Sequence, residues 1–397
     1  MAAEEIYDVV VIGGGPAGAT AADDLARRGR KVALLDKSGR IKPCGGAIPP
    51  RLIRDFDIPE HLLKARVNLA RMISPKGESV DMPIKGGYVG MVDREEFDEW
   101  LRARAARSGA ARRSGAFEKI TRDGAGGAIV HYRPRDGSAP EAQLRASMVI
   151  GADGALSAVG RQEVPGADKT KFVFAYHEIV QSPKGEDAGA DANRCEIYYR
   201  GTRSPDFYAW IFPHGDTMSV GTGSANKGFS LKTSVKDLRS LTRLDATPTV
   251  RKEGAPIPMK PLRKWDNGRD VLLAGDAAGI VAPASGEGIY YAMLGGRLSA
   301  DAAEEFLSTG NARALANARK RFMKLHGRVF WILGIMQYFW YSNDKRRESF
   351  VKLCRDPDIQ RLTWESYMNK ELVRADPMAH VRIFFKDLAH LFKFASP

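Results

Sequence analysis

Residues 7–29 read YDVVVIGGGPAGATAADDLARRG, and this stretch decides the fold. The mostly apolar run at residues 7–12 ends in glycines, and a helix-like segment follows it. A second apolar run then covers residues 32–35. A strand, a helix and a strand in this order predict a βαβ unit, which opens a parallel sheet with helices on its faces.

The glycines of this turn have the spacing GxGxxG. Gly13 permits a tight turn, Gly15 lets the backbone approach a pyrophosphate, and Gly18 allows close packing of helix and strand. The N-terminus of the following helix favours the negative charge of a phosphate. Asp36 ends the second strand, where its carboxylate can accept hydrogen bonds from a ribose. A βαβ unit without a nucleotide is the alternative, but the combination predicts a dinucleotide site.

The size and composition of the chain narrow the possibilities. A chain of 397 residues predicts two or three domains. Its three cysteines include no CxxC pair, so we expect neither a disulfide framework nor a metal site, and a reducing cytoplasm fits. The acidic N-terminus does not have the form of a secretory signal. The longest apolar run, residues 329–341, falls short of the roughly 20 residues that span a membrane, so we expect no transmembrane helix.

The hydrophobic pattern changes along the chain. Between residues 171 and 223, β-branched and aromatic residues alternate with polar ones, which predicts an antiparallel sheet with one solvated face. Residues 271–274 return to a continuous buried strand, so the first domain is interrupted and resumed. The predicted fold is α/β, α+β overall: a doubly wound Rossmann-like domain with an inserted antiparallel β-sheet domain and a helical C-terminal region.

Two later turns follow predicted strands and contain an aspartate. They read GADG at residues 151–154 and LAGDAAG at residues 273–279. Both resemble motifs of the flavin hydroxylase superfamily, in which the first contacts the FAD pyrophosphate and the aspartate of the second, here Asp276, holds the ribityl chain. Arg94 matches an arginine that this superfamily places near the dinucleotide. An Asp-Gly pair alone is only a turn, yet all three motifs occur in the superfamily's order, which favours FAD over NAD.

Two more segments are similar to those of the geranylgeranyl reductase family. Residues 42–48 read KPCGGAI, like that family's Cys-Gly-Gly segment, and residues 205–213 read PDFYAWIFP, which matches its PxxYxWxFP motif. On a strand, Tyr208, Trp210 and Phe212 share one face and would form an aromatic wall for an isoprenoid chain. An ordinary aromatic core face is the alternative. The CGGAI segment and DFDIP at residues 55–59 look most like the chlorophyll and bacteriochlorophyll branch.

The resemblance implies specific roles for individual residues. Cys44 and Tyr208 would relay or position a proton, and Trp210 and Phe212 would contact the substrate. The implied FAD site comprises Gly13, Gly15, Gly18, Asp36, Lys37, Cys44, Gly45, Gly46, Ala47, Arg94, Asp153, Gly154, Gly275, Asp276, Gly286 and Gly288. The predicted domains are 1–165 for the first part of the FAD-binding domain, with an excursion around 66–91, then 166–260 for the substrate domain, 261–310 for the returning part and 311–397 for a basic helical region.

The family implies an FAD-dependent reductase that saturates double bonds of a geranylgeranyl group, giving phytyl, in pigment biosynthesis. The substrate would be geranylgeranyl diphosphate or a geranylgeranylated (bacterio)chlorophyll. NADPH would donate electrons transiently, because the glycines at residues 124–127 do not complete a second dinucleotide fingerprint. The alternatives are a polyprenyl-lipid reductase, a flavin monooxygenase and a non-catalytic prenyl-binding escort protein.

The end of the chain carries most of the excess positive charge. The net charge is +13 overall, and residues 311–397 hold 17 Lys/Arg against 8 Asp/Glu. Apolar residues at helical spacing between Val381 and Phe392 alternate with basic ones, which predicts a basic amphipathic helix. Packing on the protein's own core is the alternative. We expect a cytoplasmic protein that lies peripherally on an anionic, photosynthetic membrane and has no nucleic-acid partner. The oligomeric state stays open.

Overall fold

The computed structural model describes residues 6–37, 41–183 and 193–370. The chain forms two compact units, each built from three separate segments. Unit 1 contains Met1–Lys42, Arg94–Phe172 and Pro256–Gly334, and unit 2 contains Pro43–Asp93, Val173–Ala255 and Ile335–Pro397.

A six-stranded sheet lies at the centre of unit 1. Strands β8, β2, β1, β10 and β16 pair in parallel in that order, and β9 pairs antiparallel with both β8 and β10. Residues 9–11 of β1 and 148–150 of β10 are fully buried, as expected for strands covered on both faces. The bounds are β1 Ile6–Ile12, β2 Val32–Asp36, β8 Ala111–Arg122, β9 Ala128–Pro134, β10 Ala142–Gly151 and β16 Val271–Leu273.

Helix α1 packs closely against α6 because both helices present small residues. An added Cβ at Gly296 of α6 would overlap the backbone of Ala17 in α1, and Ala21 and Ala22 are fully buried. Proline at the start of α1 has the backbone angle that the first helical turn needs. The helices of this unit are α1 Pro16–Arg27, α3 Arg94–Arg107, α4 Ala158–Glu163, η2 Ala167–Lys169, η3 Gly275–Ala278, α6 Ile289–Thr309, η4 Ala312–Leu315 and most of α7 Ala316–Trp340.

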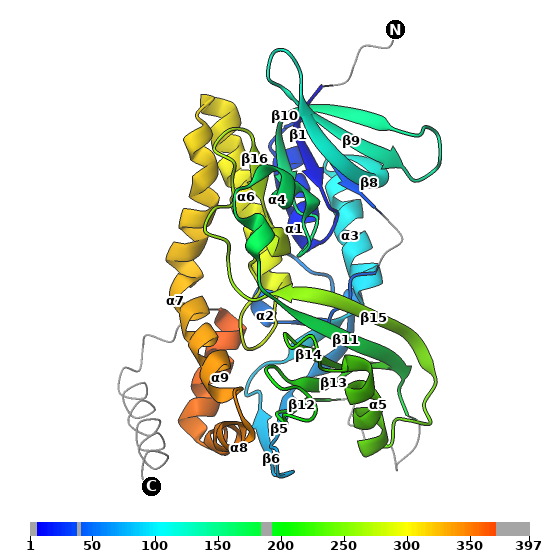
Figure 1. The fold of residues 1–397 in the computed structure, drawn as a ribbon, viewed down its shortest axis with the longest axis vertical. Helices are drawn as coiled ribbons and strands as arrows, with labels where there is room; N and C mark the ends of the chain where they lie inside the picture. The colour runs from blue at the N-terminus through cyan, green and yellow to red at the C-terminus, as the bar shows by residue number, and fades with distance from the viewer. Residues whose placement is uncertain (1–5, 38–40, 184–192, 371–397) are drawn as a thin grey trace. The chain divides into compact units, whose positions relative to one another are not determined.

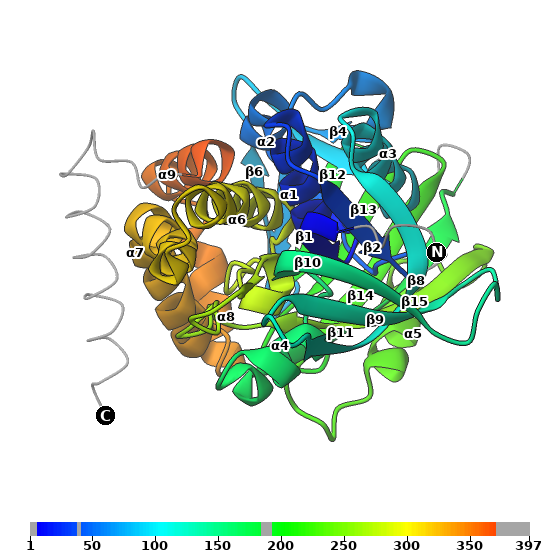
Figure 2. The same cartoon turned by 90° about the horizontal axis from the view of Figure 1, so that it is seen from above.

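Helix α7 lies alongside α6 (Figure 2), and aromatic side chains pack between the two helices. The ring of Tyr291 in α6 meets Phe330 of α7 edge-on, with centroids 4.9 Å apart, and Phe322 packs against the buried Trp265 at 5.4 Å. These are favourable geometries for aromatic pairs. One face of α7 is therefore fixed by the core of unit 1.

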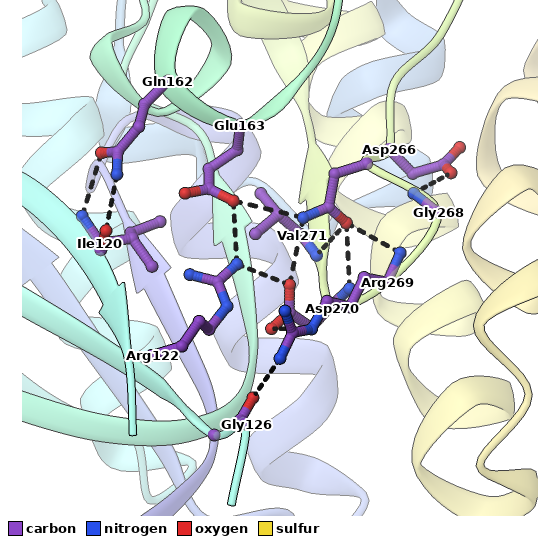
Figure 3. A network of polar contacts seen from close by, with 12 residues as sticks. Ile120, Arg122, Gly126, Gln162, Glu163, Asp266, Gly268, Arg269, Asp270 and Val271 are labelled. Carbon is purple, nitrogen blue, oxygen red and sulfur yellow. Dashed lines mark hydrogen bonds and ion pairs between the residues drawn. The ribbon is translucent and has the colours of Figure 1, made fainter. Parts of the chain in front are cut away.

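A polar network joins β8, α4 and the turn before β16 (Figure 3). Arg122 lies 2.8 Å from carboxylate oxygens of both Glu163 and Asp270, and the Asn267 amide donates to the same two carboxylates. The side chain of Gln162 donates to the carbonyl of Ile120 and accepts from its N–H. Three segments that are distant in sequence are thus tied at one end of the sheet.

Unit 2 is built on a seven-stranded sheet in the order β15, β11, β14, β13, β12, β5 and β6 (Figure 1). The pairs from β11 to β12 and the pair β5–β6 are antiparallel, whereas β5 and β12 run parallel. The bounds are β5 Leu69–Ile73, β6 Ser79–Pro83, β11 Phe172–Gln181, β12 Arg194–Tyr198, β13 Ala209–His214, β14 Thr217–Ser224 and β15 Thr249–Pro258.

Helix α5, Leu231–Leu241, covers one face of this sheet. Val235 and Leu238 of the helix pack on Ile211, Val220 and their neighbours. Because side chains alternate along a strand, the even-numbered residues of β13 point to the opposite face. That second face carries Trp210 and Phe212.

A smaller antiparallel sheet and several helices complete unit 2. Strand β7, Val89–Val92, pairs with both β3, Ala47–Ile48, and β4, Leu63–Val67. The helices are α2 Pro50–Asp55, η1 Glu60–Leu62, α8 Asp344–Leu353 and α9 Pro357–Asn369. The structure confirms the predicted α/β fold with an antiparallel insertion and a helical C-terminal region.

No helix among the described residues has the combined length and apolar character that crossing a membrane requires. The basic amphipathic helix expected between Val381 and Phe392 lies outside the described residues.

Candidate cofactor and substrate site

The turn between β1 and α1 has the geometry of a phosphate-binding loop. Gly13 has a φ of 106°, and a Cβ there would overlap the carbonyl of Ala152. A Cβ at Gly18 would overlap the carbonyl of Gly13. At Gly15, the N-cap of α1, an added Cβ meets nothing within 4 Å. The space in front of this helix N-terminus can therefore admit a phosphate.

Asp36 lies beside that turn. Its Oδ2 accepts a hydrogen bond of 2.7 Å from the Gly14 N–H, so the end of β2 is fixed to the glycine loop. Arg102 of α3 contacts both partners: its Nη1 is 3.3 Å from the Gly14 carbonyl and 3.9 Å from Asp36 Oδ1. The sequence analysis did not single out Arg102, because a contact from α3 leaves no local signal. Lys37 follows β2 and is exposed.

Asp153 is used inside its own loop. Its carboxylate accepts from the backbone N–H groups of Ala158 and Val159, at 2.7 and 3.2 Å, and from the Ser157 hydroxyl. Burial raises the pKa of Asp153 above its ordinary value. This aspartate therefore caps α4 and shapes the loop, and Gly154, with φ 87°, has open space at the position of a Cβ.

The turn after β16 places Asp276 near the N-terminus of α6. A Cβ at Gly288, the N-cap of α6, would lie 3.8 Å from Asp276 Oδ1. Gly275 and Gly286 have positive φ values of 63° and 66°, and a Cβ at Gly275 would lie 2.6 Å from that of Ala17. Glycines thus let this turn pass close to α1.

Lys42 forms an ion pair with Asp276. The Asp276 side chain is only 10% exposed, so the ammonium of Lys42 compensates a nearly buried carboxylate. Lys42 is the first residue of the KPCGGAI segment, residues 42–48, but nothing in the sequence indicates that Asp276 is its partner. Arg94 is 5% exposed, and its guanidinium binds the Asp98 carboxylate at 2.8 and 2.7 Å within α3.

The chemistry of unit 1 fits FAD. An open helix N-terminus can hold a diphosphate, the Asp36 carboxylate lies beside that loop, and Asp276 lies at the start of a second helix. Three of the motifs predicted from sequence are therefore parts of one compact unit. Among residues 6–37, 41–183 and 193–370, no cluster of His, Cys, Asp or Glu could hold a metal ion.

In unit 2 the Cys44–Ala47 loop packs on β13. A Cβ at Gly45 would lie 2.9 Å from the Phe212 ring, and a Cβ at Gly46, where φ is 72°, would overlap the carbonyl of Val92. The Cys44 sulfur accepts a weak hydrogen bond from the Gly46 N–H at 3.4 Å. Both glycines are thus required by contacts within the chain itself.

The predicted aromatic residues form a continuous row. Ring centroids lie 5.9 Å apart for Tyr208 and Trp210 and 6.1 Å apart for Trp210 and Phe212. The Trp210 indole N–H donates to the Ser219 hydroxyl, and an added Cβ at Gly221 would overlap its ring. Tyr208 itself precedes the first residue of β13.

Tyr208 lies in a buried group of hydroxyls and thiols. Burial raises the pKa of Tyr208 well above its usual range, and nearby Tyr341 and Cys44 add to the rise. The ring of Tyr199 is tilted against those of Tyr208 and Tyr341, with centroids 6.2 and 5.3 Å away, and burial likewise raises the pKa of Tyr199. The hydroxyls of Tyr208 and Tyr199 therefore keep their protons at neutral pH. The sequence analysis predicted a role for neither Tyr199 nor Tyr341. Tyr341 directly follows α7 and is far along the chain from Tyr199 and Tyr208, so no local signal indicates that these side chains meet.

His214 is a further residue that the sequence analysis missed, although it directly follows the PxxYxWxFP motif. Burial lowers the pKa of His214 to about 4, so its imidazole is neutral at physiological pH. Its Nδ1 is 3.1 Å from the Phe212 carbonyl and donates to it. A Cβ at Gly46 would lie against its Nε2, so the histidine and the glycine loop are in contact.

Comparison with known proteins extends these observations. A family model described as an FAD binding domain matches residues 6–297. A geranylgeranyl diphosphate reductase from Rhodobacter capsulatus is 57% identical over 98% of this chain and 99% of its own length. A digeranylgeranylglycerophospholipid reductase from Methanocaldococcus jannaschii is 31% identical over 81% of this chain and 83% of its own. A solved structure from Thermoplasma acidophilum, described as geranylgeranyl bacteriochlorophyll reductase-like, has a TM-score of 0.81 at 21% identity and covers 95% of this chain and 100% of its own.

Proposed function

Because the chain belongs to the FAD-dependent geranylgeranyl reductase family, we propose that it saturates double bonds of a geranylgeranyl group and yields phytyl in pigment biosynthesis. The observation that carries this proposal is the 57% identity to a geranylgeranyl diphosphate reductase along almost the whole of both chains. The substrate is geranylgeranyl diphosphate or a geranylgeranylated (bacterio)chlorophyll. Like its relatives, the protein is an oxidoreductase.

FAD, when bound, supplies the hydride chemistry that no amino-acid side chain provides. The residues of the chain itself bind the cofactor and orient it. The open N-terminus of α1 holds the diphosphate, Asp36 the ribose and Asp276 the ribityl chain. Lys37, Arg94 and the glycines of the loops belong to the same proposed cofactor set.

An isolated alkene is a poor electrophile, so a proton must arrive at one carbon as hydride reaches the other. We assign delivery of the proton to the buried hydroxyl of Tyr208 and the partly exposed thiol of Cys44, with Trp210 and Phe212 as the contact surface for the isoprenoid chain. The raised pKa of Tyr208 keeps its hydroxyl protonated but makes it a weak acid, so its proposed role is to position or relay a proton and not to supply one alone. Aromatic rings exclude water from a hydrophobic chain, and that exclusion favours the coupled step.

NADPH is the proposed electron donor. The sequence contains one complete glycine fingerprint, at Gly13, Gly15 and Gly18, which FAD would occupy. The nicotinamide cofactor would therefore visit the protein, reduce FAD and leave. We further propose a cytoplasmic protein that associates peripherally with a membrane, since the prenylated pigment is a lipid-phase substrate.

A polyprenyl-lipid reductase is the second candidate, favoured by the 31% identical relative from Methanocaldococcus jannaschii. The higher identity to the geranylgeranyl diphosphate reductase supports the pigment role. A flavin monooxygenase or a non-catalytic prenyl-binding escort protein would share parts of the fold. An escort protein, however, has no need for the full set of FAD residues.

Anaerobic turnover distinguishes these candidates. The FAD-loaded protein is reduced and offered geranylgeranyl diphosphate, a geranylgeranylated pigment and a digeranylgeranylglycerophospholipid in separate reactions. Mass spectrometry should show the gain of two hydrogens per saturated bond with one of the first two substrates. Reduction of the phospholipid alone would replace the pigment assignment, and no reduction of any prenyl chain would overturn the reductase assignment.

A further inference from the structure

One face of α7 is exposed along most of the helix. Its residues recur every three or four positions, the spacing that returns to the same side of a helix. Lys320, Lys324, Arg328, Trp331, Ile335 and Tyr338 form this row, which we call the α7 stripe, and all six are exposed. Figure 1 shows α7 as one continuous helix, in gold and orange.

The apolar side chains of the α7 stripe are unusually exposed to solvent. Trp331 is 68% exposed, Ile335 47% and Tyr338 85%, although the opposite face of the helix packs in the core through Phe322 and Phe330. Burying large side chains of this kind stabilises a protein by roughly 1.5–3 kcal/mol each. Exposed side chains of this size, consecutive on one face, mark an interaction surface.

The charged half of the α7 stripe carries one sign only. The sequence of α7 contains no aspartate or glutamate. Within the described part of the chain, Lys320, Lys324 and Arg328 take part in no ion pair. Beyond the apolar residues, α8 begins with Asp344, which pairs with Arg347. The exposed Lys345 follows, and then Arg346, whose guanidinium lies 4.2 Å from the centroid of the Phe339 ring. Positive charge therefore flanks the apolar segment on both sides.

We propose that the α7 stripe docks on an anionic lipid surface. Trp and Tyr are the aromatic residues enriched at the boundary between headgroups and acyl chains, and lysine and arginine attract anionic headgroups. An isoleucine between them adds apolar surface. The α7 helix of a second copy of the chain would offer no acidic residue to pair with these cations, so charge complementarity selects the anionic lipid.

This proposal names the docking element for the proposed membrane association and rests on that association. It assigns docking to a helix within the described residues, whereas the sequence alone pointed to the segment between Val381 and Phe392. Its test needs no catalysis, so docking and turnover can fail independently. A protein that binds vesicles but reduces no prenyl chain would keep the docking proposal and lose the reductase one.

The test is flotation of the FAD-loaded full-length protein with vesicles of phosphatidylcholine, with and without phosphatidylglycerol. One variant combines Lys320→Glu and Lys324→Glu, and another combines Trp331→Ser and Tyr338→Ser. The charge variant removes two positive charges and adds two negative ones. At on the order of fivefold for each positive charge removed, it should lose at least about 25-fold in binding to the anionic vesicles. The apolar variant should lose binding to a similar degree, and high salt should weaken the wild type.

Helix α5 supplies matched control variants. Lys232, Lys236 and Leu241 are exposed there, and Lys232→Glu with Lys236→Glu, or Leu241→Ser, make the same kinds of change on another helix. Those variants should bind vesicles within twofold of the wild type, and bound flavin and melting temperature should show that every variant is folded. Wild-type binding by both α7 variants overturns the proposal, as does equal loss in the α5 controls. Loss of binding only when residues 371–397 are deleted assigns docking to that segment and also overturns it.

Discussion

Asp276 is the residue on which the cofactor assignment can be tested most directly. Its carboxylate is nearly buried, pairs with Lys42 and lies near the first turn of α6. We predict that Asp276→Ala weakens FAD binding roughly ten- to hundredfold, the cost of losing a hydrogen bond that involves a charged group. The flavin content of the purified variant and a titration with FAD measure the effect.

Asp301→Ala is the matched control for that prediction. Asp301 is also in unit 1 and pairs with arginine side chains, but it is about one third exposed and belongs to the middle of α6. Its removal should leave FAD affinity unchanged. Equal flavin occupancy in the Asp276 variant and the wild type would contradict the role given to Asp276.

His214 makes a prediction about pH. Its pKa is lowered to about 4 in the folded protein, whereas an unfolded histidine titrates near 6.5. As the pH falls from about 6.5 to about 4, the unfolded chain binds a proton here and the folded chain does not. Above pH 6.5 the ionisation of this residue therefore does not change the free energy of unfolding. Below pH 6.5 the free energy of unfolding falls progressively, by at most about 3 kcal/mol from this residue.

The replacement His214→Gln should remove part of this loss of stability at acidic pH. Melting temperatures of the wild type and the variant are measured between about pH 4 and pH 7. The difference between them should be smaller at pH 4 than at pH 7, because only the wild type loses stability through this histidine. His61→Gln changes an exposed histidine and serves as the control. Parallel curves for the wild type and the His214 variant would show that the imidazole is not held neutral.

At the scale of elements, the network around Arg122 joins β8, α4 and the turn before β16. Its two carboxylates, those of Glu163 and Asp270, are 13% and 6% exposed. Arg122→Ala leaves both without their main cation, and we predict a loss of about 2–3 kcal/mol in the free energy of unfolding. Urea unfolding at neutral pH measures this loss.

An exposed ion pair between β8 and β9 gives the comparison. Arg133 of β9 binds Glu118 of β8 at 2.5 Å, but the Arg133 side chain is 66% exposed. Arg133→Ala should cost less than about 1 kcal/mol, because solvent screens an exposed ion pair. If both variants lose the same small amount, the network contributes no more than an ordinary surface contact.

At the scale of the whole molecule, substitutions in the two units should have different effects: those in unit 1 on FAD binding, and those in unit 2 on reduction of the substrate. We predict that Tyr208→Phe and Cys44→Ser, both in unit 2, keep FAD bound but slow the reoxidation of reduced flavin by substrate. The Tyr208 hydroxyl is buried beside aromatic rings, the Cys44 sulfur accepts from the Gly46 N–H, and neither residue belongs to the glycine loops of unit 1. Anaerobic single-turnover absorbance measures the rate.

Tyr176→Phe removes a different hydroxyl from the same sheet and is the control, since Tyr176 donates to Glu178 near the core under α5. Its reoxidation rate should match that of the wild type. Unchanged rates in the Tyr208 and Cys44 variants would remove both residues from the proton path.

The sequence predicts those features that depend on neighbours in the chain. The βαβ unit at residues 7–35 and the turn at Asp276 follow from strand, glycine and helix signals within a few residues of one another. Contacts between distant segments leave no such signal, so the pairing of Lys42 with Asp276 was not predicted. The bonds by which the Asp153 carboxylate caps α4 are local, but the sequence of the GADG turn does not show which way that carboxylate points.

The way β16 pairs with β10 has a consequence for synthesis on the ribosome. Val149 of β10 has Val271 of β16 as its parallel partner, and the second segment of unit 2 is translated between them. At about 5–20 residues per second, the edge of β10 stays open for on the order of ten seconds after it emerges. During this interval the last residues of β10, 149–151, lack their partner on one edge, and an unpaired strand edge of this kind exposes the nascent chain to aggregation.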